Sequence, residues 1–231
     1  MTLKEELNAY VKKTHDAAWV KREGQKVPSA DDVTLGTDAV TLQATVLYAD
    51  LSDSTALVKG WESWFAAEIY KNYLYCASRI IKAQGGVITA FDGDRIMAVY
   101  LGKSKNTSAV KTGLKITWAV TNVLQPALLA KYPKTKFKYS QKVGIDTSPL
   151  FVAKTGVRGS NDLVWVGNAA NNAAKLAALN QGHSTYITGN IYKYIHESAK
   201  FGSDPKKNMW TDLGSADFGY QIYGSSWLSG V

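Results

Sequence analysis

An apolar run that ends in an acidic residue constrains the fold of this chain more than any other feature. The run Ala44–Ala49 reads as a strand, and it delivers Asp50 to a tight turn at the start of a helix. A second acidic residue, Asp94, follows Asp92-Gly93, and this dipeptide between two apolar runs predicts a β-hairpin. If strand and hairpin are neighbours in one sheet, the two carboxylates lie close together. Such a pair suits two divalent cations that hold a triphosphate.

The other elements give the order β-α-β-β-α-β, which is typical of a ferredoxin-like α+β fold with an antiparallel sheet and helices on one face. We expect residues 1–40 to form an N-terminal helix and a connector, and residues 41–231 to form a catalytic domain. The expected helices cover 3–20, 55–83, 104–132 with a stop or kink near Pro126, 168–180 and 191–199. The expected strands cover 44–49, 86–91, 95–100, 140–145, 150–157, 185–188 and 220–223.

Composition excludes several classes of function. The net charge is +8, but the lysines are scattered and form no long basic run, so we expect no nucleic-acid partner. A polyanionic small substrate accounts for the excess equally well. No apolar segment approaches the roughly 20 residues that cross a bilayer, and we expect no membrane contact. Cys76 is the single cysteine, which fits the reducing cytoplasm.

A third group of polar residues lies in Gly167–Lys175. On a helix, Asn171 and Lys175 are four residues apart and face the same side. The segment fits an Ala-rich surface helix, and it equally fits a functional pair in which Asn171 holds a ribose and Lys175 neutralises charge on a reacting phosphorus. Asp50 and Asp94, each taken alone, also fit a helix cap and a turn. There is no P-loop, dinucleotide-binding or zinc-ligand pattern.

Three blocks of sequence, in order and at this spacing, resemble the class III nucleotidyl cyclases, the catalytic domain of adenylate and guanylate cyclases. The first is Tyr48–Thr55, against Phe-x-Asp-Ile-x-Gly-Phe-Thr in the family. The second is Gly93–Tyr100, against Gly-Asp-x-x-Met-Ala-x-Phe. The third joins Gly144-Ile145 and Gly167 to Ala170–Lys175. The resemblance covers about residues 44–224.

The resemblance implies a homodimer with composite active sites. Asp50, the Leu51 carbonyl and Asp94 of one subunit would hold two divalent cations, Mn²⁺ or Mg²⁺. Asn171 and Lys175 would reach in from the other subunit. Ser54 and Thr55, at the end of the first block, are assigned to substrate binding. The ribose 3′-hydroxyl then attacks the α-phosphorus, and pyrophosphate leaves.

Two departures from the family pattern concern the base. The positions that read a purine edge in the family are occupied here by Ala90 and Val164, which cannot make those hydrogen bonds. Tyr48, where Phe is usual, faces the same way as Asp50 by strand alternation, and with Arg95 it would suit a smaller base.

This pattern is similar to the bacterial pyrimidine cyclases of antiphage defence, whose product activates a separate effector protein. We therefore expect conversion of UTP to cyclic UMP, with CTP to cyclic CMP as the alternative. A catalytically weak nucleotide-binding module is a further alternative. Lys175 replaces the usual Arg, and the late Lys that grips the terminal phosphate has no clear counterpart in residues 212–219.

Overall fold

The computed structural model describes residues 1–202, 206–215 and 218–231, and these form two compact units. One unit consists of Met1–Gln43 and Pro149–Gly167, and the other of Ala44–Ser148 and Asn168–Val231. Two long strands, β2 (Asp38–Leu51) and β5 (Gln141–Val157), contribute residues to both units. This division into units does not test the domain boundary expected between residues 40 and 41, which stays a prediction.

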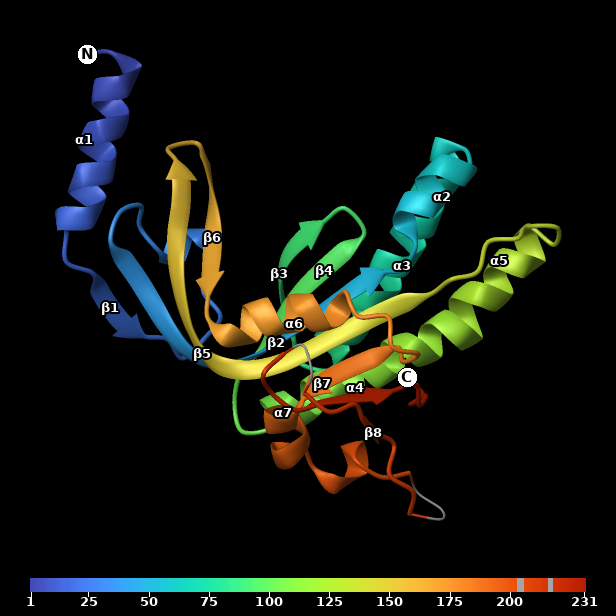
Figure 1. The fold of residues 1–231 in the computed structure, drawn as a ribbon. Helices are drawn as coiled ribbons and strands as arrows, with labels where there is room; N and C mark the ends of the chain where they lie inside the picture. The colour runs from blue at the N-terminus through green and yellow to red at the C-terminus, as the bar shows by residue number, and fades with distance from the viewer. Residues whose placement is uncertain (203–205, 216–217) are drawn as a thin grey trace. The chain divides into compact units, whose positions relative to one another are not determined.

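The larger unit is built on a sheet with the strand order β3-β4-β2-β5-β7-β9-β8 (Figure 1). The pairs β2–β4, β3–β4, β7–β9 and β8–β9 are antiparallel, whereas β5 and β7 are parallel. The predicted α+β class and the β-α-β-β-α-β order are confirmed, and the sheet is mixed. Its shorter strands are β3 (Val87–Asp92), β4 (Arg95–Tyr100), β7 (Thr185–Thr188), β8 (Thr211–Asp212) and β9 (Ile222–Ser225).

Helices cover both faces of this sheet, whereas the sequence predicted helices on one face. Ile187 of β7 belongs to the core formed with α3 and α4, and the neighbouring Tyr186 packs against Leu176 of α6. Successive strand residues point to opposite faces, so α6 lies opposite α3 and α4. The helices are α2 (Ser54–Gly60), α3 (Ser63–Ala83), α4 (Lys105–Ala119), α5 (Gln125–Lys131), α6 (Asn168–Ala177) and α7 (Gly189–Tyr194).

A glycine allows α6 to pack closely on the sheet. A Cβ at Gly144 would lie 2.1 Å from the carbonyl oxygen of Ala173 and 2.5 Å from the nitrogen of Ala177. Any side chain at this position of β5 would push α6 away. The Gly-Ile pair of the third sequence block therefore has a packing role.

The long helix predicted over 104–132 is present, with a local change of pitch. A π-helical segment, Val120–Leu124, joins α4 to α5, and Pro126 falls at the start of α5. Proline has no N–H and collides with the preceding turn, and a π-helical turn accommodates the break without ending the helix. The helix does not stop near Pro126, and the irregularity there is this π-helical segment.

Other predicted elements differ from the structure. The helix expected over 55–83 is interrupted at Trp61-Glu62, between α2 and α3. The strands expected over 140–145 and 150–157 are one strand, β5. The helix expected over 191–199 is shorter, with a 3₁₀ turn at Glu197–Ala199, and the closing strand is shifted to β9.

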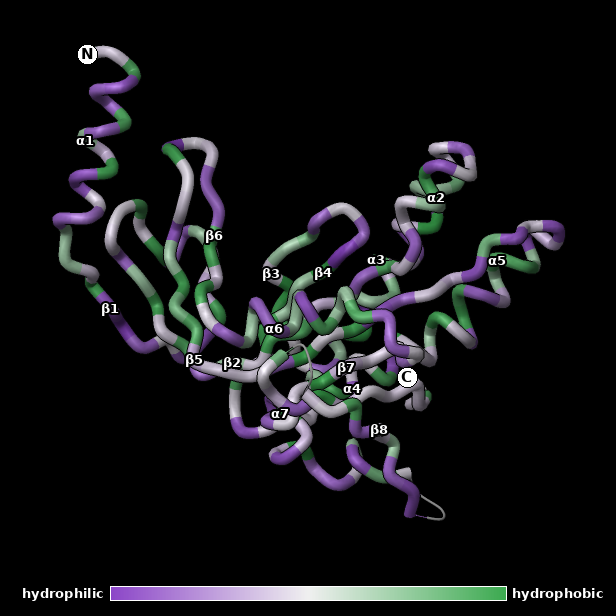
Figure 2. Tube along the Cα trace, viewed as in Figure 1, coloured by the Kyte–Doolittle hydropathy of each residue, from purple (hydrophilic) through white to green (hydrophobic). Residues whose placement is uncertain are grey.

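The smaller unit joins the N-terminal segment to a hairpin. Helix α1 (Leu3–Asp16) begins with a capping box at Thr2 and buries no residue; hydrophilic and hydrophobic stretches alternate along it (Figure 2). It ends before the predicted residue 20, because β1 (Val20–Glu23) pairs in parallel with β2. Strand β6 (Ser160–Val166), which was not predicted, pairs with the end of β5. No helix in the described part of the chain is both long and apolar enough to cross a membrane.

Candidate active site

The register of three strands sets a row of side chains on one face of the sheet. Tyr48 of β2 and Ala90 of β3 both lie opposite Met97 of β4. At the next position on the same face, two residues away along each strand, Asp50 and Asp92 both lie opposite Arg95. Cross-strand partners share a face, so Tyr48 and Asp50 point the same way, as the sequence predicted. The intervening residues of β2 and β4, Ala49 and Ile96, belong to the core on the other face.

The hairpin turn brings Asp94 to the same edge. Strand β3 ends at Asp92 and β4 begins at Arg95, so Gly93 and Asp94 form the turn. Gly93 has φ +59, a conformation that glycine adopts without strain. The turn lies one residue later than the predicted Asp92-Gly93.

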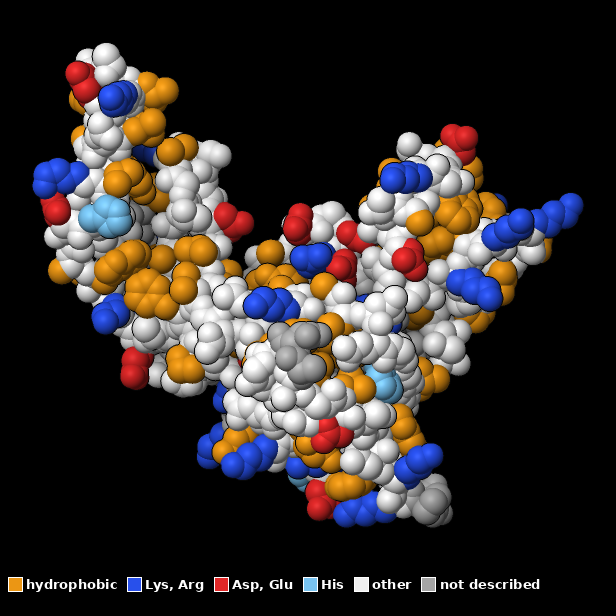
Figure 3. All heavy atoms as spheres, in the orientation of Figure 1, with side chains coloured by type: hydrophobic (Ala, Val, Ile, Leu, Met, Phe, Trp, Pro, Cys, Tyr) orange, Lys and Arg blue, Asp and Glu red, His pale blue; other side chains and the backbone are white. Residues whose placement is uncertain are grey.

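The acidic residues at this edge are only partly neutralised. Arg95 Nη2 donates to Oδ2 of Asp50 over 3.1 Å, and the Asp50 side chain is 19% exposed. Burial raises the pKa of Asp50; Arg95 opposes this shift, and the charges of Asp94 and Asp92 add to it. Acidic and basic side chains gather around the β3–β4 hairpin (Figure 3).

These residues fit a divalent cation. Oδ2 of Asp94 is buried and has no hydrogen-bond partner among the described residues. An unpaired, buried carboxylate oxygen beside a second carboxylate is the environment that a hard cation stabilises. No group of three His, Cys, Asp or Glu side chains that could hold a metal ion occurs in the part of the chain that the structure describes. Further oxygen donors would come from the Leu51 carbonyl and from the substrate.

A cavity of about 620 Å³ opens beside Asp50. The loop after β2 and the end of α6 form much of its lining, and Ser54 and Thr55 are part of it. Two lysines that were not predicted as site residues, Lys59 and Lys142, also line it. The full lining is Asp50–Ala56, Lys59, Ser140, Lys142 and Ala177–Asn180.

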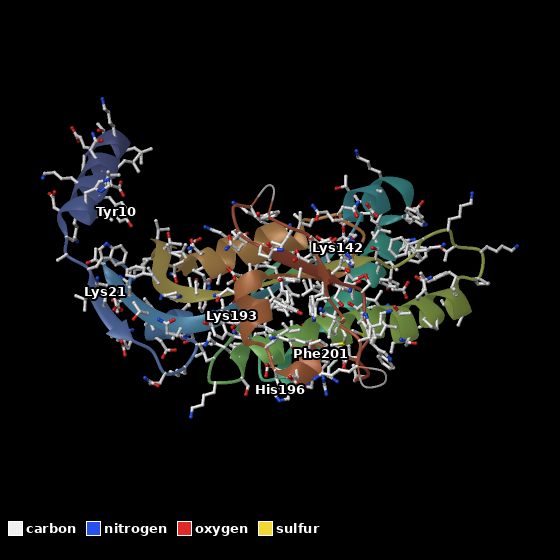
Figure 4. The ribbon with its side chains drawn as sticks, turned by 60° about the horizontal axis from the view of Figure 1, so that its bottom comes forward. Tyr10, Lys21, Lys142, Lys193, His196 and Phe201 are labelled. Carbon is white, nitrogen blue, oxygen red and sulfur yellow. The ribbon has the colours of Figure 1, made fainter. Side chains whose placement is uncertain are left out.

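Lys142 is the better placed of the two lysines. It is half-buried on β5, and its Nζ donates to the carbonyl of His183 over 2.6 Å (Figure 4). Burial lowers its pKa, and the charge of Asp53 opposes this shift. The sequence signal that could have revealed Lys142 is its position two residues before Gly144, the residue with which the third sequence block begins.

The turn after Asp50 has an unusual backbone. Asp53 has φ 61 and ψ 23, and it is the one residue other than glycine with positive φ in the described part of the chain. The first family block has glycine at this position, and the left-handed conformation gives the physical reason. Asp53 is the N-cap of α2, without a side-chain cap bond.

Asn171 and Lys175 are not brought to the acidic residues within one chain. Both are exposed on α6, and neither lines the cavity that Asp50 lines. The next residue, Asn172, donates to Oδ2 of the buried Asp146 over 2.8 Å, which fixes the rotation of the helix. The action of Asn171 and Lys175 across a dimer interface stays a prediction.

The remaining predicted site residues are more scattered. Ala90 is half-buried in the row with Tyr48. Val164 belongs to the smaller unit, where it is 40% exposed on β6 opposite Ala153. Ala216 and Asp217, within the segment searched for a late Lys, lie outside the described residues.

Comparison with known proteins gives consistent results, although no protein-family model matches the chain. A uridylate cyclase of Xanthomonas perforans is 49% identical over 229 residues, which are 98% of each chain. A uridylate cyclase of Burkholderia cepacia is 45% identical over the same share.

Solved structures show the same fold at lower identity. The adenylyl cyclase CyaB from P. aeruginosa has a TM-score of 0.68 and 23% identity, over 81% of this chain and 95% of that one. The guanylyl cyclase Cya2 has a TM-score of 0.67 and 16% identity, over 82% and 94%. A class III adenylyl cyclase-like ATP-binding protein from Pseudomonas aeruginosa has a TM-score of 0.63 and 19% identity, over 84% and 43%.

Proposed function

Because the chain belongs to the uridylate cyclase family of class III nucleotidyl cyclases, we propose that it converts UTP to 3′,5′-cyclic UMP and pyrophosphate. One observation carries the proposal: Asp50, Asp94 and Arg95 converge at the sheet edge beside a cavity that two lysines line. Two acids and nearby lysines are what a nucleoside triphosphate and its metal ions need.

The triphosphate would bind in the cavity of about 620 Å³. Lys142 and Lys59 supply positive charge there, and the half-buried position of Lys142 strengthens its attraction to phosphate oxygens. Ser54 and Thr55 add hydroxyl donors, and backbone N–H groups of the turn add more. The net charge of +8 favours the approach of a polyanion.

Asp50, the Leu51 carbonyl and Asp94 would hold two divalent cations, Mn²⁺ or Mg²⁺. When bound, such ions stabilise charge on the phosphate oxygens and lower the pKa of the attacking hydroxyl. Arg95 keeps the Asp50 carboxylate oriented through its hydrogen bond.

The row Tyr48, Met97 and Ala90 would form the base pocket. Its small and apolar members leave no partner for the polar edge of a purine, whereas the Tyr48 hydroxyl and Arg95 offer hydrogen bonds to a smaller ring. The charge of Arg95 acts on Tyr48, opposing the upward shift that burial gives its pKa, so the two groups are close. A carbonyl at C4 distinguishes uracil from cytosine, and CTP is the second substrate to test.

Asn171 and Lys175 would act from a second copy of the chain. Asn171 orients the ribose, and Lys175 neutralises charge on the α-phosphoryl group. The 3′-oxygen gives its proton to water and forms a bond to the α-phosphorus. The bond between the α-phosphorus and the oxygen that bridges to the β-phosphorus breaks, and pyrophosphate leaves with that electron pair.

We extend the proposal to the cellular role. The enzyme would act in the cytoplasm, where it meets UTP, and its cyclic product would activate a separate effector protein in antiphage defence. This role rests on the resemblance of the sequence to pyrimidine cyclases of such systems.

The test is a panel of UTP, CTP, ATP and GTP with Mn²⁺, in which cyclic nucleotide and pyrophosphate are both measured. We expect cyclic UMP as the main product, and its loss in Asp50→Ala and Asp94→Ala proteins that remain folded by circular dichroism. Cyclic AMP or cyclic GMP as the main product would contradict the base pocket. Stabilisation by UTP with Mn²⁺ but no pyrophosphate would instead favour a nucleotide-binding module, the alternative that the Lys175 replacement raises.

A further inference from the structure

The smaller unit leaves much of its apolar surface open to solvent. Among the described residues, half of the large hydrophobic side chains that are exposed belong to this unit, although it holds a minority of the chain. Single exposed apolar side chains are ordinary, whereas a large group of them marks a surface that another molecule covers. Helix α1 and the β5–β6 hairpin carry most of this group.

Helix α1 has an apolar stripe that its own chain does not cover. The stripe recurs at i, i+4, i+7 and i+8, which is one side of a helix, and consists of Leu3, Leu7, Tyr10 and Val11. Each of the four is more than half exposed. Within the described part of the chain, the hydrogen bonds of α1 stay inside the helix and its caps. A helix of 14 residues is marginal in water on its own, so a packing surface is needed to stabilise it.

The β5–β6 hairpin has one covered face and one open face. On the covered face, Lys154 Nζ donates to the Ala30 carbonyl over 2.8 Å, and the 3₁₀ turn Ala30–Asp32 packs against β6. Exposure alternates accordingly along β6: Trp165, which shares this face, is half-buried, whereas Val166 is exposed.

The open face of the hairpin is apolar. Val166 lies opposite Phe151, and Val164 lies on the same face two residues earlier in β6. Trp19, which follows α1 in the chain, packs edge-on against Phe151 with 4.9 Å between ring centroids. Val157 lies on this face at the end of β5. The exposed fractions are 41% for Trp19, 68% for Val157, 40% for Val164 and 54% for Val166.

The open helix and the open sheet face belong to the same unit, so two copies related by a two-fold axis can cover both at once. The eight exposed side chains of the stripe and the face present on the order of 800 Å² per copy, about what each partner contributes to a stable interface. Strand β6 is also followed, after Gly167 alone, by the helix whose Asn171 and Lys175 would act in the partner's site. To that extent the inference rests on the proposed function, which supplies the second copy.

We propose that two copies of the chain exchange α1: the stripe of Leu3, Leu7, Tyr10 and Val11 in one copy packs on the open β5–β6 face of the other, and the exchange is reciprocal. The occupant of each open surface is thus a second copy of this chain. The N-terminal helix then holds together the dimer that the composite site requires.

Cross-linking between chains tests the exchange. In a Cys76→Ser background, which removes the native thiol, Leu7→Cys and Val166→Cys are made in separate proteins, mixed under conditions of subunit exchange and treated with a short bismaleimide. We expect a covalent dimer in the mixture. The matched control replaces Val166→Cys with Tyr194→Cys, a similarly exposed position on α7, and should give little covalent dimer.

A charge in the stripe tests the energetics. Leu7→Glu should raise the dimer dissociation constant about 10-fold or more in sedimentation equilibrium, because a buried leucine would become a buried carboxylate. Leu7 is exposed within one chain, so circular dichroism should be unchanged. Specific activity should fall at low protein concentration and recover as the concentration rises. Leu129→Glu, at an exposed leucine of α5, is the matched control and should leave the dissociation constant at the wild-type value.

The outcomes separate this inference from the proposed function. An unchanged dissociation constant in Leu7→Glu would overturn the exchange while leaving the cyclase activity intact. Cross-linking only within a chain that carries both cysteines would also overturn it, since α1 would then cover its own hairpin. Binding of α1 to a separate protein or to vesicles, with no covalent dimer, would have the same meaning. A cross-linked dimer that makes no cyclic UMP would instead contradict the proposed function and leave the exchange standing.

Discussion

At the scale of single residues, the site is organised around acids that the fold alone does not neutralise. Asp50 accepts a hydrogen bond from Arg95, yet burial and the neighbouring acidic residues raise the pKa of Asp50. The sequence identified Asp50 and Asp94 because a strand end and a hairpin turn are local patterns. Lys142 was missed, since only the packed structure shows which lysine lines a cavity.

We predict that Asp50→Asn stabilises the protein in the absence of divalent cations. The folded pKa lies above the unfolded value, so the folded state binds more protons, and stability falls as pH rises from the unfolded to the folded pKa. Replacing the Asp50 carboxyl group with an amide removes this loss of stability at higher pH. Urea unfolding in EDTA should give a higher free energy of unfolding for the variant near pH 7 and equal values near pH 3. Turnover should fall about 10³-fold, because a metal ligand is lost.

A second prediction concerns the left-handed backbone at Asp53. Asp53→Ala should lower the free energy of unfolding by about 1 kcal/mol, because a Cβ without a polar group pays the full steric cost of this conformation. Asp53→Gly should be tolerated within a few tenths, about 0.3 kcal/mol, since glycine relieves strain but loosens the unfolded chain. Urea unfolding of both variants tests the pair, and a more stable Ala than Gly variant would contradict the assignment.

At the scale of elements, local patterns located most helices and strands but not their joins. The Asp-Gly hairpin, an irregularity of the helix near Pro126 and the strand at Thr185–Thr188 were all predicted. The joins depend on tertiary contacts: β5 continues through Pro149, and β6 forms because it pairs with β5. The π-helical pitch before Pro126 likewise has no sequence pattern of its own.

Helix α6 offers a test of how an element positions its exposed residues. Buried Asp146 accepts from Asn172 over 2.8 Å and from Thr188 over 2.6 Å, and these bonds tie α6 to the sheet. Asn172→Ala should lower the free energy of unfolding by about 1–2 kcal/mol, because it leaves Asp146 underbonded. It should lower kcat more than it changes KM, because Asn171 and Lys175 lose their orientation.

The matched control for Asn172 is Asn161→Ala near the start of β6, where the amide donates to the Val157 carbonyl at an exposed site. Its unfolding free energy should change by less than about 0.5 kcal/mol, as at most surface positions. Denaturation and steady-state kinetics of both variants separate the two cases. Equal effects would mean that Asp146 does not anchor the helix.

At the scale of the whole molecule, one chain holds every predicted group but not one complete site. Asp50 lines the cavity, whereas Asn171 and Lys175 are exposed elsewhere on α6. The family pattern in the sequence implied this arrangement, and composition or periodicity alone could not, because a composite site is a property of two copies. The catalytic groups would then be divided between subunits.

Mixing two inactive variants tests that division. Asp50→Ala removes a metal ligand, and Lys175→Ala removes a charge that would act from the other subunit. If the subunits exchange at random, half of the dimers are mixed, each mixed dimer has one intact site, and activity should recover to about a quarter of wild type. The measurement is cyclic UMP formation after co-refolding the variants, with each variant refolded alone as the control. A site contained within one chain would give no recovery, since every chain in the mixture lacks one of its own groups.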